Sequence, residues 1–223
     1  MKGKLIVISG TDGSGKGTQT DLLVQRLKDE NYPVKITDFP QYGQKSAGMV
    51  EEYLNGKFGT ADEVGPYRAS IFYACDRYEA SFRMHKWLKE GNIIVSNRYV
   101  SANMGHQAGK IQNLKERDEY LGWLENLEYN IFGIPRPDKN LLLYMPADVA
   151  QKLVDQKGHR DYVGGHKRDI HEADLNHLQN AASAYKYVAQ KYDWTTINCA
   201  KDEEPLTRET IHEMVWNEVK KLI

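Results

Sequence analysis

Short apolar runs alternate with longer amphipathic segments along the chain. Five runs rich in Val, Ile and Leu predict strands, at residues 4–9, 34–39, 92–97, 140–145 and 194–198. Because nearly every position in these runs is apolar, they are typical of strands that are buried on both faces of a parallel sheet. Strands that alternate with helices favour an α/β fold, in which a five-stranded parallel sheet is flanked by helices.

The segments between these runs predict helices, at residues 16–30, 46–55, 66–90, 114–129, 148–156, 172–191 and 205–222. In the long segment 66–90, Ile71, Ala74, Cys75 and Tyr78 lie along one side, and we expect this side to cover the sheet. The composition shifts nowhere in a way that marks a second domain, and no internal repeat is present. We therefore predict a single domain over residues 1–223.

One polar insert interrupts the alternation at residues 157–169. It is rich in charged side chains and is punctuated by Gly158, Gly164 and Gly165. Such a segment buries little apolar surface, so we expect a mobile lid at about residues 157–171.

Charge and cysteine content limit the partners that this chain can have. The 30 Lys and Arg residues nearly balance the 31 Asp and Glu residues, so no overall field attracts nucleic acid or a membrane surface. Cys75 and Cys199 lie far apart without metal-binding spacing, and we expect both to be buried apolar residues. No apolar run reaches membrane-spanning length. These features predict a protein of the reducing cytoplasm.

The most specific motif follows the first predicted strand, where Gly10, Gly15 and Lys16 satisfy G-x-x-x-x-G-K. Glycines let the backbone turn its N–H groups towards phosphate oxygens, and the following helix adds the positive end of its dipole. The sequence therefore predicts a site for a nucleoside triphosphate, with Lys16 on the β- and γ-phosphates. The expected contacts are Gly10, Asp12, Gly13, Ser14, Gly15, Lys16, Gly17 and Thr18.

Further motifs follow in a fixed order: FP at residues 39–40, CDRYE at 75–79, NRYVSAN at 97–103, PRPD at 135–138, and then the polar insert. In this order they resemble thymidylate kinase, over nearly the whole chain. The resemblance implies a three-layer P-loop kinase fold with a mobile lid, and transfer of the γ-phosphoryl group of ATP to dTMP, which gives dTDP for dTTP synthesis. It also implies Mg²⁺ as a cofactor and a cytoplasmic homodimer that pairs through helices.

The same resemblance assigns the acceptor side of the site. Asp12 faces the deoxyribose and its 3′-hydroxyl, and Phe39 forms a wall beside the acceptor or, alternatively, packs in the core. Tyr73 and Arg77 lie four residues apart and so share one helix face. In the family such a pair reads the thymine base, by stacking and by donation to a base carbonyl. The alternatives are core packing for Tyr73 and a surface ion pair with Asp76 or Glu79 for Arg77.

Arg98 follows a buried strand at its carboxyl end, where ligands of open α/β sheets bind. A guanidinium there suits the acceptor phosphate, whose oxygens it can grip in a fork; the alternative is a structural ion pair. The resemblance places Asn103 and His106 beside the sugar, where they exclude a 2′-hydroxyl. His106 departs from the family, which more often has Tyr or Phe at that place.

Two departures concern the metal. Asn97 stands where the family normally has an aspartate, and Gly17 stands where the motif has a Ser or Thr hydroxyl. We therefore expect no dedicated protein metal site, with Mg²⁺ held mainly by the phosphates and water.

The lid supplies the remaining charge. Some thymidylate kinases carry an arginine in the loop where this chain has Gly13, and others carry arginines in the lid. This chain is similar to the second type, so Arg160 and Arg168 are the candidate catalytic arginines beside Lys16 and Arg98. Phosphoryl transfer needs alignment and charge stabilisation rather than a covalent nucleophile.

Other readings of the sequence stay open. The phrase GSGKGTQ is also typical of adenylate kinases, so a kinase for another nucleoside monophosphate is the nearest alternative. A P-loop ATPase, or a nucleotide-binding protein with weak catalysis, is a second. The product formed from a panel of nucleoside monophosphates would separate these readings.

Overall fold

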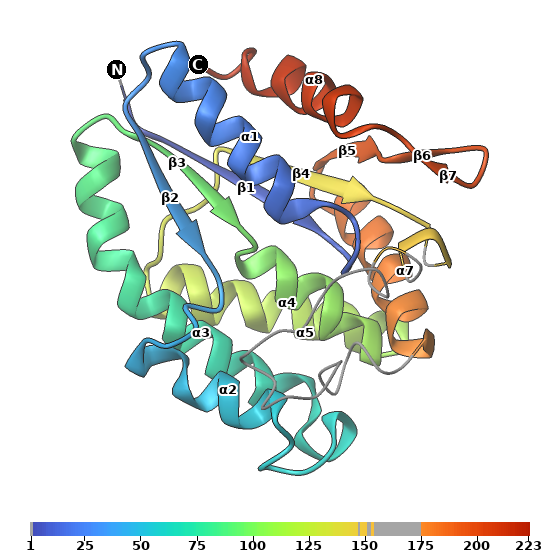
Figure 1. Cartoon of the computed structure of the whole chain (residues 1–223). Coiled ribbons are helices and arrows are strands. Elements are labelled where there is room, and N and C mark those ends of the chain that lie inside the picture. Colours follow the sequence, from blue (N-terminus) through green and yellow to red (C-terminus); the bar gives the residue numbers. More distant parts are fainter. Residues whose placement is uncertain (1, 147, 151–152, 154–174) are drawn as a thin grey trace.

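In the computed structural model, which describes residues 2–146, 148–150, 153 and 175–223, the central element is a parallel sheet of five strands. The strand order is β2-β3-β1-β4-β5, so the chain reverses its direction of winding next to β1 (Figure 1). The carboxyl ends of β1 and β3 therefore form the place where this kind of fold binds ligands. The bounds are β1 (Lys4–Gly10), β2 (Val34–Asp38), β3 (Ile93–Asn97), β4 (Lys139–Tyr144) and β5 (Thr195–Asn198).

Helices cover both faces of the sheet, as predicted (Figure 1). α1 (Lys16–Asp29) and α8 (Arg208–Val219) lie on one face. The other face is covered by α3 (Ala61–Lys89), α4 (Val100–His106), α5 (Leu114–Glu125) and α7 (Leu175–Lys191). The shorter elements are the 3-10 turns η1 (Lys45–Ala47) and η2 (Ala108–Lys110), helix α2 (Gly48–Leu54), the π-helix η3 (Asn126–Ile131) and the hairpin β6 (Ala200–Lys201) and β7 (Glu204–Pro205).

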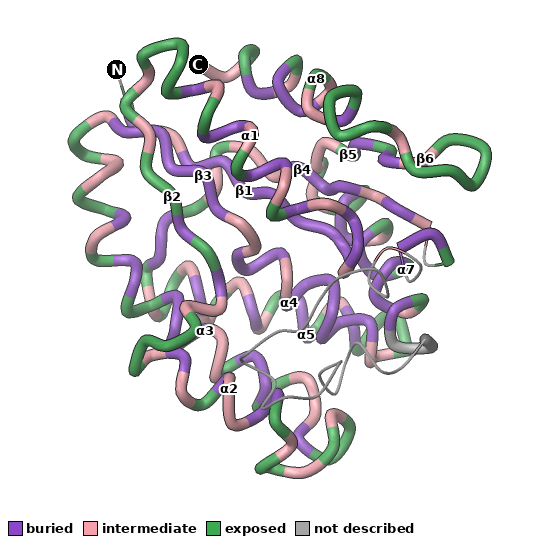
Figure 2. The backbone as a smooth tube through the Cα atoms, viewed as in Figure 1, coloured by how far each residue is buried: buried purple, intermediate pink, exposed green. Residues whose placement is uncertain are grey.

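Alternate side chains of β1 pack into two separate parts of the hydrophobic core, one on each face of the sheet. Ile6 and Ile8 point towards α1 and α8, whereas Leu5 and Val7 point towards the larger helical layer. All four side chains are buried, and the tube of β1 is buried along nearly its whole length (Figure 2). Burying the sheet on both faces holds the strand ends rigidly, and these ends carry the candidate site.

The exposed face of α3 is a correction to the sequence analysis. Ile71, Cys75 and Tyr78, which we expected to cover the sheet, are exposed, and only Ala74 of that group is buried. The face that packs inward instead carries polar side chains together with small apolar ones. The buried residues of α3 are Val64, Ala69, Ser70, Ala74, Asp76, Arg77, Ala80, Ser81 and Met84. Because these polar groups are hydrogen-bonded in the interior, hydrophobicity alone pointed to the wrong side.

Element boundaries differ from the predictions in a few places. β2 is an edge strand and is partly exposed, so it is not buried on both faces. α3 begins at Ala61, five residues before the predicted start, and bends at Gly65. Helix α4 was not predicted. The predicted lid, with Arg160 and Arg168, and most of the predicted helix 148–156 lie outside the described residues.

Candidate active site

The predicted phosphate-binding loop joins β1 to α1 at the carboxyl edge of the sheet. Gly10, Gly13 and Gly15 all have positive φ angles, which only glycine adopts readily. No side chain caps the start of α1, so its first N–H groups face outward as donors for an anion. The Nζ atom of Lys16 is held 2.7 Å from the carbonyl oxygen of Thr11.

Gly13 is the position where some family members carry an arginine, and the fold leaves no room for one. A Cβ atom at residue 13 would lie 2.2 Å from the carbonyl oxygen of Ala150, and φ is +84°. A side chain would need movement of the backbone on both sides of this contact. The loop of this chain therefore cannot supply a catalytic arginine in its present conformation.

Asp12 links the two predicted phosphate-binding cations. Its Oδ1 atom lies 3.5 Å from Nζ of Lys16 and also accepts a short hydrogen bond from Nη2 of Arg98. Burial by itself would lower the pKa of Arg98, but the negative charge of Asp12 outweighs it and the pKa lies above its ordinary value. Arg98 also has φ of 63°, a left-handed conformation that is strained for a non-glycine residue and is typical of functional sites.

Aromatic and imidazole side chains surround Arg98. The Nε2 atom of His106 lies 3.1 Å from Nη1 of Arg98, and because a guanidinium can only donate, Nε2 accepts in this contact. Three tyrosines raise the pKa of Arg98, which means that their hydroxyls lie near its charge: Tyr185, Tyr42 and Tyr73. The structure thus brings the predicted residues Asp12, Tyr73, Arg98 and His106 together.

The position of His106 depends on the packing of α4 against α7. A Cβ atom at Gly105 would lie 2.3 Å from the ring of Tyr185, so only glycine lets the two helices approach this closely. The ring of His106 then meets the ring of Tyr185 edge-on, with centroids 5.5 Å apart.

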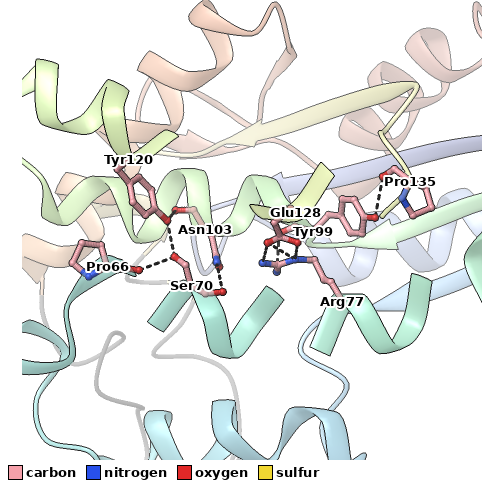
Figure 3. Close-up of polar contacts among 8 residues, drawn as sticks. All are labelled: Pro66, Ser70, Arg77, Tyr99, Asn103, Tyr120, Glu128 and Pro135. Carbon is pink, nitrogen blue, oxygen red and sulfur yellow. Dashed lines mark hydrogen bonds and ion pairs between the residues drawn. The ribbon is translucent and has the colours of Figure 1, made fainter. Parts of the chain in front are cut away.

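Arg77 lies in the interior, where its charge is paired. Its side chain is 1% exposed and pairs with Glu128, which is 0% exposed, through a fork from Nε and Nη2 (Figure 3). Nη1 faces the carbonyl oxygen of Tyr99 at 3.4 Å. Burial would lower the pKa of Arg77, but the charge and hydrogen bonds of Glu128 raise it above the ordinary value. The guanidinium is thus engaged by Glu128 in this structure, and its donation to a base carbonyl stays a prediction.

Asn103 and Phe39 are also buried rather than open. Nδ2 of Asn103 donates to the carbonyl oxygen of Ser70, 3.4 Å away, in a network with the hydroxyl of Tyr120 (Figure 3). Phe39 packs on the ring of Tyr99, 5.7 Å between centroids, so the core-packing alternative describes it. The contact of Asn103 with the sugar stays a prediction.

Several residues of the site were missed by the sequence analysis. Glu128 lies on η3, where the wider π turn directs it into the core. Tyr42 lies two residues after Pro40, so the predicted FP motif could have pointed to it as a site residue. Asp38 ends β2 and accepts a hydrogen bond from Asn97. Desolvation by neighbouring protein atoms raises the pKa of the Asp38 carboxyl, and it outweighs the hydrogen bond from Asn97, although the residue itself is exposed.

Comparison with known proteins identifies the family to which this site belongs. The family model described as thymidylate kinase matches residues 8–211. The chain belongs to the thymidylate kinase family. Members of this family transfer the γ-phosphoryl group of ATP to dTMP, and this is the reaction of the chain.

Individual relatives agree with this assignment. Thymidylate kinase from Mycobacterium tuberculosis is 28% identical over 187 residues, which cover 83% of this chain and 85% of that protein. The enzyme from Plasmodium falciparum is 25% identical over 213 residues, which cover 96% and 90%. The solved structure of thymidylate kinase from Candida albicans has a TM-score of 0.76 at 20% identity and covers 99% of this chain and 92% of that one. That likeness shows the three-layer fold.

Neither a membrane span nor a metal cluster is found in the described part of the chain. No helix there is long and apolar enough to cross a bilayer. No group of three or more His, Cys, Asp or Glu side chains there is arranged to hold a metal ion.

Proposed function

We propose that Lys16 and Arg98 hold the two phosphate groups between which the phosphoryl group moves. The observation that carries this proposal is Asp12, whose carboxylate contacts both cations. ATP lies on the loop 10–18 with its γ-phosphate at Lys16, and the phosphate of dTMP lies at Arg98. Asp12 keeps the two cations close together and partly neutralised until substrates bind.

Mg²⁺ is the cofactor that we propose for this reaction, and the residues present fit it as a hydrated ion. Mg²⁺ retains several waters and is held by one or two carboxylates plus the substrate phosphates. Asp38 and Asn97 offer a carboxylate and an amide oxygen at the ends of neighbouring strands. When bound, the ion neutralises charge on the transferring phosphoryl group.

Tyr73 is proposed as the aromatic side chain that stacks on the base. Its ring packs edge-on against Tyr53, with centroids 6.4 Å apart. Its hydroxyl is among the groups that raise the pKa of Arg98, after the larger effect of Asp12. A ring fixed in this way, near the phosphate-binding cation, is suited to a pyrimidine nucleotide. His106 would flank the sugar from the opposite helix, α4.

Product formation with a panel of acceptors tests the function. We expect ADP release from ATP to depend on dTMP and to produce dTDP, with dUMP measured beside it because the Candida albicans enzyme is described as having broad substrate specificity. Turnover of AMP or CMP in preference to dTMP would support a kinase of another nucleotide. ADP release without any acceptor would instead indicate an ATPase.

We propose that the protein is a cytoplasmic homodimer. Support for the dimer comes from the exposed stripe of α3, which consists of Tyr67, Ile71, Tyr78 and Phe82, exposed by 42, 41, 41 and 65%. These residues recur at helical spacing on one face, and a second copy of the same stripe would cover it symmetrically. Support for the cytoplasm comes from two free thiols, of which Cys75 is exposed.

Replacing Phe82 by glutamate tests the dimer. Because each copy of the stripe would then bury a charge against apolar side chains, we expect the dimer to dissociate at about 100-fold higher concentration. Sedimentation velocity measures this shift. Leu114→Glu is the matched control, since Leu114 is 57% exposed on α5 outside the stripe. A wild-type monomer, or equal effects of both changes, would contradict the proposal.

A further inference from the structure

The ends of β2 and β3 carry the two side chains that offer oxygen atoms to hydrated Mg²⁺, and their contacts define a separate role for each. Asp38 and Asn97 lie opposite each other in the parallel register of the two strands. Nδ2 of Asn97 donates to Oδ1 of Asp38 over 2.9 Å. Asn97 also neighbours β1, opposite Ile8, just before the phosphate-binding loop begins. The pair therefore lies at the ligand-binding edge of the sheet, next to the predicted triphosphate.

The hydrogen bond fixes the orientation of the Asn97 amide. Because a carboxylate only accepts, Nδ2 must face Asp38, and Oδ1 of Asn97 must face away from it. This Oδ1 atom is buried and has no hydrogen-bond partner among the described residues. Buried acceptors in folded proteins are nearly always satisfied, so the atom calls for a donor that is not a protein group, such as a bound water.

Helix α1 packs against β2 and β3, the strands that carry this pair. Besides desolvation, which raises it, the pKa of Asp38 is lowered by the positive charge of Arg98 and raised by the negative charge of Asp21 on α1. Gly17 and Asp21 are four residues apart and share one face of α1. A Cβ atom at Gly17 would meet nothing within 4 Å, so there is open space where the motif normally places a hydroxyl. The strand ends and this face of the helix together adjoin the place for the cation of a bound triphosphate.

We propose that Asp38 is the acid of this cation site: it supplies the negative charge that Asn97 lacks, and together the two side chains bind water molecules of the Mg²⁺ ion that accompanies ATP. The inference rests on the proposed binding of ATP to loop 10–18. The negative charge that is usual at position 97 on β3 is thus carried in this chain by Asp38, the hydrogen-bonded neighbour of Asn97 on β2. Asp38 offers acceptors to the hydrated ion, and the unpartnered Oδ1 of Asn97 accepts from another of its waters.

The test compares ATP binding with and without Mg²⁺. Calorimetric titration of ATP alone, in Mg²⁺ and then in EDTA, gives a ratio of dissociation constants for each variant. Asp38→Asn keeps the size and an acceptor for Asn97 but removes the charge. We expect it to weaken ATP binding in Mg²⁺ by about tenfold and to strengthen binding in EDTA by about threefold, because the repulsion of phosphate is lost.

A charge swap gives the second arm. In Asp38→Asn with Asn97→Asp, the carboxylate returns to β3, and we expect the Mg²⁺ ratio to recover to within about threefold of the wild type. Asp29→Asn, at the far end of α1, is the matched control and should leave the ratio unchanged. Mn²⁺ in place of Mg²⁺ allows the bound ion to be counted by its paramagnetic signal, and Asp38→Asn should weaken Mn²⁺ binding in the presence of ATP.

The outcomes separate the inference from the proposed function. An equal loss of affinity in Mg²⁺ and EDTA would mean that Asp38 only supports the fold, and an unchanged ratio would exclude it from the cation site; either result overturns the inference. Failure of the wild type to bind ATP in both conditions would instead overturn the proposed ATP site.

Discussion

Replacing Arg98 by alanine is expected to reduce kcat/KM for dTMP by about 1,000-fold. Arg98 is the cation that we place on the acceptor phosphate, and two charge-assisted hydrogen bonds contribute about 4 kcal/mol in total. The loss also removes one of the two cations that contact Asp12, so its carboxylate is less neutralised and repels the incoming phosphate. Initial rates over a range of dTMP concentrations at saturating ATP measure the effect.

Two controls show whether this loss belongs to the acceptor. Arg98→Lys keeps the charge but not the planar fork, so we expect an intermediate loss of about 10- to 50-fold. ATP binding without dTMP should stay within about threefold of the wild type in both variants. A loss of ATP affinity as large as the loss of kcat/KM would contradict the assignment of Arg98 to dTMP.

Replacing Glu128 by alanine is expected to lower the free energy of unfolding by about 3–5 kcal/mol. The change leaves the charge of Arg77 buried without its carboxylate, and an unpaired buried charge is strongly destabilising. Denaturant unfolding, followed by circular dichroism, measures the loss. Glu79→Ala on the exposed side of α3 is the matched control, with an expected change below about 1 kcal/mol because its ion pair with Arg83 is exposed.

A double variant then separates stability from base recognition. Replacing Arg77 by methionine and Glu128 by leucine removes both charges, and such exchanges of a buried pair are often neutral or stabilising. Because Arg77 is enclosed in the core, we expect the double variant to fold with stability within about 2 kcal/mol of the wild type and to keep its KM for dTMP within about threefold.

The opposite result would confirm the original prediction for Arg77. If the double variant folds and binds ATP normally but its KM for dTMP rises more than about tenfold, the guanidinium contacts the base in the working enzyme. The structure favours the first outcome because Nε and Nη2 are occupied by Glu128 and the side chain is 1% exposed.

Local patterns predicted the sheet and the nucleotide loop well. The strand of Lys4–Gly10 was visible as an apolar run, and Gly10, Gly15 and Lys16 marked the turn into α1. Both signals are local, because strand burial and a glycine turn depend on residues next to each other in the chain. Arg98 could be placed beside the nucleotide loop from its position after a strand, since all parallel strands end at the same edge.

The partners of these side chains could not be predicted in the same way. Arg77 and Glu128 are 51 residues apart, and the π turn that directs Glu128 inward has no clear sequence signal. The same applies to the inward face of α3, where hydrogen bonds to distant elements allow polar side chains to be buried. Hydrophobic periodicity reports which residues avoid water, and it carries no information about satisfied polar groups.

By itself, the sequence determined that this protein has an α/β fold with a triphosphate loop, and its motifs identified the kinase family. The tertiary structure alone decided which charges act together. It joined Asp12 to Arg98 across 86 residues and Asp38 to Asn97 across 59 residues. The physical reason is that electrostatic interactions depend on distance in space and on burial, and both are set only when the strands and helices pack.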